Sequence, residues 1–312
     1  MAGIPLITGA TGFAGSHLLD LLLADHDLVH AWSNPGGRAP AQADPRVRWR
    51  AVDLLDRASV ESGLREASPS VIYHCAGVAD VQQSWRAPAR ALAVNALGTH
   101  RLLDAASRLG FRGRVLVTGS ALVYARSTAA LTESDPLAPI GPYAVSKLAQ
   151  EMTAARSDIE VILTRPFNHA GPRQDDSYVT SAFARQIADI ERGIGEPVLY
   201  VGNLDARRDI TDVRDVVRAY RELARQGTPR LPYNVCRGQA YRVGDLLNIL
   251  LSLATVGVEV RTDPARLRPS DNPVVLGSHE RLTRDTGWTP AIPIERTLAD
   301  ILDYWRAPAP AA

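Results

Sequence analysis

Two side chains that could move a proton stand one helical turn apart near the middle of the sequence. Tyr143 and Lys147 occur in the run Tyr-Ala-Val-Ser-Lys, and an i, i+4 spacing places the phenol and the ammonium on the same face of a helix. Lys147 is also the single lysine among 35 basic side chains, the rest being arginines. Because a compact ammonium with an adjustable pKa is not replaceable by a guanidinium, we expect a specific role for this lysine.

A serine completes the set. Ser120 directly follows a strand expected over 114–118, and its hydroxyl would hold the oxygen of a carbonyl or alcohol substrate. We expect the nearby ammonium to lower the pKa of Tyr143 from about 10 toward neutrality, so that the phenol gives or takes a proton at working pH. Ser120, Tyr143 and Lys147 are therefore the predicted catalytic residues.

A glycine-rich loop lies at the start of the chain. The segment Thr8-Gly-Ala-Thr-Gly-Phe-Ala-Gly15 follows a predicted strand at 4–8 and opens a predicted helix at about 13–24. Glycines at such a turn let the backbone approach a pyrophosphate, and the helix N-terminus offers it N–H groups and a positive dipole. We predict a dinucleotide site that includes Gly9, Thr11, Gly12, Phe13, Ala14 and Gly15.

The residues after the second and third strands bear on which dinucleotide binds. The second strand ends at Trp32-Ser33-Asn34 without the acid that usually binds the ribose 2′-hydroxyl of NAD. The next charge is Arg38, which could receive a 2′-phosphate, so NADP(H) is favoured and NAD(H) is the alternative. Asp53, just after the third strand, would either accept a hydrogen bond from the adenine amino group or cap the following helix.

The pattern of elements predicts an α/β fold with a doubly wound parallel sheet of the Rossmann type. Pro, Gly and Asp gather in two later segments, as expected of loops that line a site. We assign residues 1–165 to the dinucleotide-binding domain, with about 200–235 returning to it, and residues 166–312 mainly to a smaller substrate-binding lobe. The expected strands cover 4–8, 28–32, 48–52, 71–74, 114–118 and 160–164, the helices 13–24, 88–109, 143–155, 180–191, 213–225 and 243–253, and the loops 166–177 and 263–273.

Composition excludes several classes of protein. A net charge of +1 gives no electrostatic footprint for nucleic acid or an anionic membrane. With 46% hydrophobic and 22% charged residues the chain can bury a core. Cys75 and Cys236 lack metal-ligand spacing and fit a reducing compartment. The N-terminus lacks the basic region of a secretory signal, so we expect a soluble cytoplasmic protein without a metal.

The chain resembles the extended short-chain dehydrogenases/reductases that act on nucleotide sugars. Within that class it is similar to enzymes acting on GDP-mannose derivatives, above all to the reductases of GDP-6-deoxy-4-keto-mannose. The class likeness rests on the glycine loop, His74-Cys-Ala-Gly77, Asn95-Ala-Leu-Gly-Thr99, the Ser120, Tyr143 and Lys147 set, and Arg165-Pro-Phe-Asn168; the closer likeness rests on the segments 165–173, 202–209 and 233–236.

The resemblance implies an NAD(P)H-dependent reduction of the 4-keto group of a GDP-6-deoxy-4-keto-hexose, of the GDP-6-deoxymannose or GDP-rhamnose type. Tyr143 would protonate the developing alkoxide, and Lys147 would bind the nicotinamide ribose. Asp271 departs from the family's usual glutamate, and His169 is expected to pack locally. The resemblance adds cofactor contacts at Leu54 and Ala76, and substrate contacts at Ser120, Asn168, Val179, Arg185, Arg208, Arg268 and Asp271.

Other functions stay open at this point. A nucleotide-sugar 4-epimerase or decarboxylase with tightly bound NAD could use the same three residues, and cofactor exchange would distinguish it. A GDP-mannose 4,6-dehydratase needs extra acid–base groups where this chain has Ala121 and Leu122. A non-catalytic dinucleotide sensor would not need the Ser, Tyr and Lys set. The helices at 90–109 and 143–155 resemble those that pair in dimers of the family, so we expect a homodimer.

Overall fold

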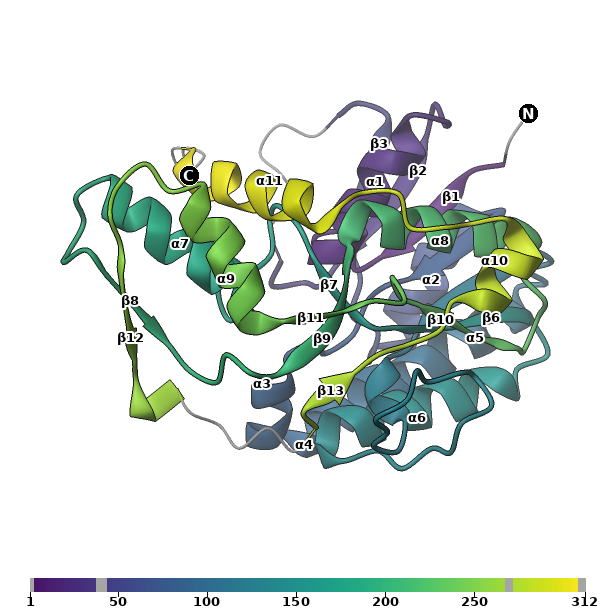
Figure 1. The fold of residues 1–312 in the computed structure, drawn as a ribbon. Coiled ribbons are helices and arrows are strands. Elements are labelled where there is room, and N and C mark those ends of the chain that lie inside the picture. Colours follow the sequence, from purple (N-terminus) through teal and green to yellow (C-terminus); the bar gives the residue numbers. More distant parts are fainter. Residues whose placement is uncertain (1–2, 38–43, 267–271, 308–312) are drawn as a thin grey trace.

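Seven parallel strands form the main sheet, in the order β10-β6-β5-β4-β1-β2-β3 (Figure 1). The computed structural model describes residues 3–37, 44–266 and 272–307. The inner strands are runs of buried apolar residues, as a sheet covered on both faces requires. The predicted doubly wound α/β fold is confirmed. The strands are β1 Pro5–Thr8, β2 Val29–Ser33, β3 Val47–Ala51, β4 Val71–His74, β5 Arg114–Thr118, β6 Glu160–Pro166 and β10 Pro232–Val235.

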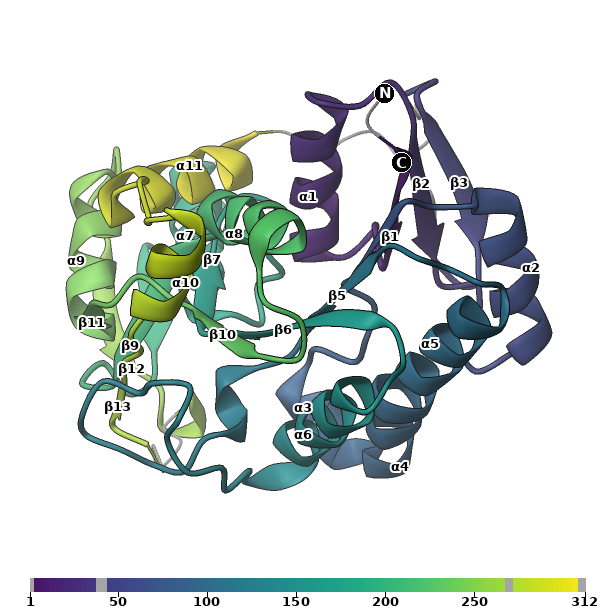
Figure 2. The same cartoon turned by 90° about the vertical axis from the view of Figure 1, so that its right-hand side faces the viewer.

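Helices cover both faces of this sheet (Figure 2). One face carries α1 (Phe13–Leu23), α8 (Val213–Gln226) and α10 (Glu280–Thr286), which pack over a core that includes Ile7, Leu18 and Tyr220. The other face carries α2 (Arg57–Ala67), α5 (Gly98–Arg108) and α6 (Gly141–Ala155), over a core that includes Ile72, Leu102 and Val115. The sheet is therefore the middle layer of three.

The helix expected over 88–109 is interrupted. It consists of α4 (Pro88–Leu92), a π-helical turn at Ala93–Leu97 and α5. The wider turn holds the buried side chain of Asn95, which accepts a hydrogen bond from the backbone N–H of Val78 at 2.8 Å and donates one to the Ser146 hydroxyl at 2.8 Å. Such turns often occur at functional sites, and this one fixes the start of α5 against α6. The short α3 (Val81–Arg86) precedes α4.

A smaller lobe follows β6 in the chain. Its core is built by α7 (Val179–Glu191), α9 (Val243–Ser252) and α11 (Ile294–Arg306). Part of the loop expected over 166–177 is a strand, β7. The sequence did not indicate this strand, because three residues are too few for an alternating pattern to be recognised. In this lobe β9 (Arg207–Asp212) pairs with β7 (Asn168–Ala170), β11 (Ala240–Arg242) and β13 (Val274–Val275), and β8 (Val198–Val201) pairs with β12 (Glu259–Thr262).

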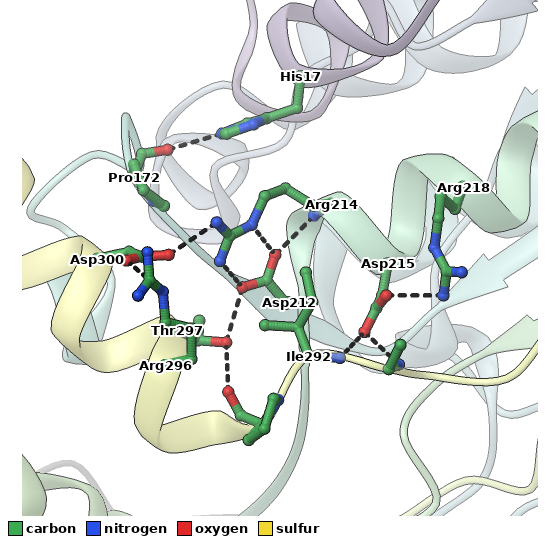
Figure 3. A network of polar contacts seen from close by, with 12 residues as sticks. His17, Pro172, Asp212, Arg214, Asp215, Arg218, Ile292, Arg296, Thr297 and Asp300 are labelled. Carbon is green, nitrogen blue, oxygen red and sulfur yellow. Dashed lines mark hydrogen bonds and ion pairs between the residues drawn. The ribbon is translucent and has the colours of Figure 1, made fainter.

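A buried carboxylate joins this lobe to the start of α8 (Figure 3). Asp212, the last residue of β9, accepts hydrogen bonds from the Arg214 guanidinium at 2.7 Å and from the Thr297 hydroxyl of α11 at 2.7 Å. Arg214 also forms an ion pair with Asp300 of α11 at 2.7 Å. The C-terminal helix is thereby attached to the strand that enters the lobe. In the described part of the chain, no helix has the length and apolar character needed to cross a membrane.

Candidate functional site

A cavity of about 840 Å³ opens at the carboxyl ends of the central strands. The chain order reverses beside β1, since β2 follows on one side and β4 lies on the other. Open α/β sheets bind their ligands at this kind of switch point. The cavity lining contains the described residues predicted for catalysis and cofactor binding together with one substrate residue: Gly9, Thr11, Gly12, Phe13, Ala14, Gly15, Asp53, Leu54, Ala76, Ser120, Tyr143, Lys147 and Asn168.

The glycine loop between β1 and α1 passes very close to the end of β4. Gly9 has φ +69°, and a Cβ added there would lie 2.7 Å from the Cα of Ala76. A Cβ on Gly15 would overlap the carbonyl oxygen of Gly9. Gly12 caps α1 without a side-chain hydrogen bond, and the first turn holds no acidic residue. The loop is therefore a backbone cradle at a positive helix end, which fits the diphosphate of a dinucleotide.

The three predicted catalytic side chains lie on the wall of the same cavity. Ser120 ends the segment after β5, where its Oγ accepts a hydrogen bond from the backbone N–H of Leu122 at 3.1 Å. Tyr143 and Lys147 come from the first turns of α6, which begins at Gly141-Pro142 because proline suits the first helical turn. The Ser120 hydroxyl lies close enough to the phenol of Tyr143 to affect its pKa. The phenol and hydroxyl that should share a substrate oxygen are thus already together.

The charge state of the phenol differs from the prediction. Burial raises the pKa of Tyr143 to about 12, and the nearby Ser120 hydroxyl opposes this only in part. The predicted lowering is wrong because burial outweighs it; the Lys147 ammonium donates to the Thr118 carbonyl at 2.9 Å and to Gln150 Oε1 at 2.9 Å. Burial lowers the pKa of Lys147 itself to about 8. At neutral pH the phenol therefore keeps its proton and can donate it.

The structure describes some of the residues that were expected to distinguish NADP from NAD. Ser33 and Asn34 line the cavity at the end of β2, and Arg38 lies outside the described residues. Asp53 lines the cavity, and its carboxylate accepts a hydrogen bond from the backbone N–H of Leu55 at 2.8 Å. The cap of α2 is Asp56 instead, so the capping alternative for Asp53 is wrong. Its contact with adenine stays a prediction.

The predicted substrate residues are less concentrated. Asn168 lines the cavity at the start of β7. Val179, the first residue of α7, is not part of the lining. Arg208 on β9 also lies off the lining; it donates to the carbonyl of Arg207 at 2.8 Å, and burial lowers its pKa. Arg268 and Asp271 lie outside the described residues.

Arg185 is engaged elsewhere. Its guanidinium forms an ion pair with Asp176, approaches Asp189 to 3.7 Å and lies over the Trp305 ring at 5.5 Å from the centroid. Arg185 is not part of the cavity lining. The structure therefore does not bring Arg185 to the site, and a role for it in substrate binding stays a prediction.

Two arginines of the cavity lining were not predicted as site residues. Arg173 has φ +72°, uncommon for a side chain other than glycine, and its guanidinium donates to His17 Nδ1 and Asp20, each at 2.7 Å. The Gly-Pro-Arg run after a strand end was the signal for it. Arg90 of α4 also lines the cavity. His169 packs locally as expected, stacked on Phe13 with ring centroids 5.6 Å apart.

Comparisons with known proteins agree with this geometry. The family model described as GDP-mannose 4,6 dehydratase matches residues 6–301. GDP-6-deoxy-D-mannose reductase of Pseudomonas aeruginosa is 39% identical over 308 residues, which cover 96% of each chain. UDP-glucose 4-epimerase of Mycolicibacterium smegmatis is 31% identical over 324 residues, covering 96% of this chain and 98% of that protein. The structure of RMD from Pseudomonas aeruginosa complexed with NADPH has a TM-score of 0.87 and 36% identity, covering 98% of this chain and 99% of that one.

The matched proteins include a reductase and an epimerase, so the family name alone does not choose the reaction. The fold, the glycine cradle and the agreement over nearly the whole chain do fix the class. The protein is an extended short-chain dehydrogenase/reductase and belongs to the GDP-mannose 4,6 dehydratase family.

Proposed function

We propose that the protein reduces the 4-keto group of a GDP-6-deoxy-4-keto-hexose, of the GDP-6-deoxymannose type, with NADPH. The observation that carries this proposal is that Ser120, Tyr143 and Lys147 line the same cavity as the glycine cradle. The raised pKa of Tyr143, caused by burial, supports a phenol that keeps its proton. Reduction of a ketone needs one proton donor and one group that holds the oxygen. The similarity to a GDP-6-deoxy-D-mannose reductase and to a structure containing NADPH supports the substrate class and the cofactor.

Each residue of the site has a role in this reaction. NADPH, when bound, supplies the hydride for the carbonyl carbon. The Ser120 hydroxyl donates a hydrogen bond to the carbonyl oxygen and stabilises the negative charge that develops there. The Tyr143 phenol then gives its proton to that oxygen, so that the product leaves as the neutral alcohol. Lys147 remains an ammonium below about pH 8 and holds the cofactor ribose beside the phenol.

The acidic groups of the cavity favour reduction over dehydration. In the described lining they are Asp53, Asp80 and Asp175. Each accepts hydrogen bonds from backbone N–H groups of its own turn. The residues after Ser120 are Ala121, which is buried, and Leu122. Elimination of water would need an acid and a base beside the sugar ring, and the side chains of Ala121 and Leu122 cannot move a proton.

The test is to supply freshly made GDP-4-keto-6-deoxy-mannose with NADPH or NADH and to follow cofactor oxidation and product by NMR. We expect stoichiometric oxidation of NADPH and a GDP-6-deoxyhexose. A second candidate is a 4-epimerase, favoured by the 31% identity to UDP-glucose 4-epimerase. It would consume no cofactor and would purify with nicotinamide bound, and that result would overturn the reductase proposal.

We also propose a homodimer. Apolar side chains are exposed along α4 and its π-helical turn and along α6, which pack together: Leu92 (46%), Leu97 (42%), Val145 (47%) and Met152 (61%). A second copy of this surface would cover them. Light scattering should give twice the chain mass, and Met152→Glu should give the monomer mass. A monomeric wild type at micromolar concentration would overturn this proposal.

The division of the chain and its location are proposals of the same kind. We propose a cofactor-binding unit of residues 1–165 to which about 200–235 return, and a substrate lobe formed mainly by 166–312. The position of β10 at the edge of the main sheet and of α8 against α1 supports the return. The two cysteines, Cys75 and Cys236, are free thiols, which supports a cytoplasmic location.

A further inference from the structure

The Lys147 ammonium is held by two acceptors that cannot turn away. The side chain is 5% exposed, and its Nζ donates to the Thr118 carbonyl and to Gln150 Oε1, both at 2.9 Å. The Thr118 acceptor is a backbone carbonyl at the end of β5, and the Gln150 side chain is fully buried. An ammonium has three N–H bonds. One of them is therefore left for the cavity, toward Gly77, whose added Cβ would lie 3.4 Å from Nζ.

The orientation of the Gln150 amide follows from its other neighbour. Gln150 Nε2 lies 2.9 Å from Thr99 Oγ1, and the Thr99 hydroxyl donates its proton to the carbonyl of Asn95 at 2.6 Å. A hydroxyl has only one proton to give, so Thr99 must accept from Gln150. The amide N–H₂ therefore faces Thr99, and the amide oxygen faces Lys147.

The same hydroxyl fixes the tautomer of a buried histidine. His74 Nε2 lies 2.8 Å from Thr99 Oγ1, which has no proton left, so Nε2 carries the hydrogen and donates it. His74 Nδ1 then accepts from the Thr8 hydroxyl at 2.8 Å. Burial and the charge of Lys147 lower the pKa of His74 to about 3, so the ring is neutral. The chain of hydrogen bonds runs from Lys147 to Thr8, the residue before the glycine cradle.

We propose that Gln150 is a positioning residue, fixed by Thr99 and His74, that holds the Lys147 ammonium with one N–H directed to the cofactor side of the cavity. This inference rests on the proposed function in taking Lys147 as the residue that contacts the nicotinamide ribose. Gln150 touches neither cofactor nor substrate, since it lies behind Lys147 and off the cavity lining.

The titratable groups around Lys147 are neutral or paired elsewhere, so its side-chain acceptor is the neutral amide of Gln150. On β4, His74 is neutral, and burial raises the pKa of the Cys75 thiol to about 12. On α6, Tyr143 keeps its proton, and Glu151 is committed to Arg165 through hydrogen bonds of 2.9 Å and 2.6 Å. A carboxylate in place of the Gln150 amide would thus be the first anion bonded to the ammonium.

The single lysine of the chain makes this testable at one atom. In protein grown with isotope-labelled lysine, the side-chain NMR signal belongs to Lys147 alone. Its titration is compared, without cofactor or substrate, in the wild type, Gln150→Glu and Gln150→Met. We expect Gln150→Glu to raise the midpoint by about one pH unit or more, because an adjacent anion stabilises the ammonium. We expect Gln150→Met to lower it, because an acceptor is lost.

If Gln150 had only a structural role, Gln150→Glu and Gln150→Met would not shift the Lys147 titration midpoint in opposite directions. Equal midpoints in the three proteins, or shifts in the same direction, would overturn the proposal. Gln186→Glu is the matched control: it lies on α7, its Oε1 accepts the Tyr200 backbone N–H at 3.1 Å, and it should leave the Lys147 titration unchanged. If Gln150→Glu does not fold, Gln150→Met and Thr99→Val, which frees the amide to turn, must both lower the midpoint.

A second readout separates this inference from the proposed function. NADPH affinity is measured by fluorescence at several pH values, with no sugar present. Gln150→Met should bind NADPH about tenfold more weakly at pH 7, because the Lys147 ammonium is no longer held toward the cofactor and its hydrogen bond to the ribose is lost. Gln150→Glu should keep its affinity for NADPH to higher pH. Moved titrations without any reduction of the GDP-sugar would overturn the reductase proposal alone. Reduction of the sugar with unmoved titrations would overturn the role of Gln150 alone.

Discussion

Replacing Gly15 by alanine should weaken cofactor binding far more than it weakens the fold. A methyl group at Gly15 would overlap the Gly9 carbonyl oxygen and lie 2.9 Å from the Gly9 carbonyl carbon. Both atoms are backbone, so neither can rotate away, and α1 must move back from the loop. The φ of Gly15 is outside the left-handed region, so alanine adds no backbone strain of its own.

The size of the effect follows from what the displacement breaks. A shift of about 1 Å removes one or two charge-assisted hydrogen bonds from the helix N-terminus to the diphosphate, each worth about 1.5–3 kcal/mol. A loss of about 2–4 kcal/mol raises the Kd for NADPH about 30- to 1,000-fold. Crowding costs the fold about 1–3 kcal/mol, and the better helix propensity of alanine returns about 1 kcal/mol of it.

The assay is a fluorescence titration with NADPH, with thermal unfolding followed in parallel. Gly12→Ala should fall between Gly15→Ala and the wild type, because its Cβ would lie 3.2 Å from the same Gly9 oxygen. Gly257→Ala is the control, since nothing lies within 4 Å of its added Cβ. A folded Gly15→Ala protein that binds NADPH within about threefold of the wild type would refute the placement of the diphosphate at α1.

Three other outcomes are expected. Tyr143→Phe should lower kcat about 10²- to 10⁴-fold with an almost unchanged Kd for NADPH, and a smaller loss would point to another proton donor. The kcat/KM for the keto-sugar should be flat at neutral pH and fall about tenfold per pH unit above the Lys147 pKa of about 8, as the ammonium is lost. Folding lowers the pKa of Lys147, so the unfolded state binds more protons than the folded state above pH 8. The same titration therefore makes the fold more stable as pH rises. An activity loss at pH 9 that coincides with unfolding would contradict the assignment of this loss to Lys147. Glu151→Gln leaves buried Arg165 without its carboxylate and should cost about 3–5 kcal/mol in urea unfolding, and a cost below about 1 kcal/mol would mean that Arg165 finds another partner.

The part of the fold that repeats a strong local pattern was predictable. The bounds of β4 and β5 agree with the prediction at both ends, because each is a short apolar run between polar turns. The Tyr143 and Lys147 pair was predictable for a similar reason, since one helical turn is enough to place both on one face. The glycine cradle follows from a strand, a turn and a helix that are contiguous in sequence.

What the sequence could not supply depends on contacts between distant segments. β13 has two residues and exists only because β9 pairs with it. The pKa of Tyr143 depends on its burial by the surrounding elements, and one acceptor of the Lys147 ammonium, the Thr118 carbonyl, comes from β5. Gln150 gave no signal of its own, although a histidine ending the apolar strand β4 marked a buried polar group that needed partners.

The position of β10 has a consequence for how the protein is made. The main sheet receives its edge strand only at residues 232–235, and the core beneath α8 is completed by Leu282 and Trp288. A ribosome adds about 5–20 residues per second, so these pieces emerge on the order of ten seconds after β6. Until residues 213–226 have emerged, the apolar face of α1 has no α8 to cover it. The N-terminal half therefore cannot complete its sheet and core on its own, and must wait during synthesis for segments made more than 60 residues later.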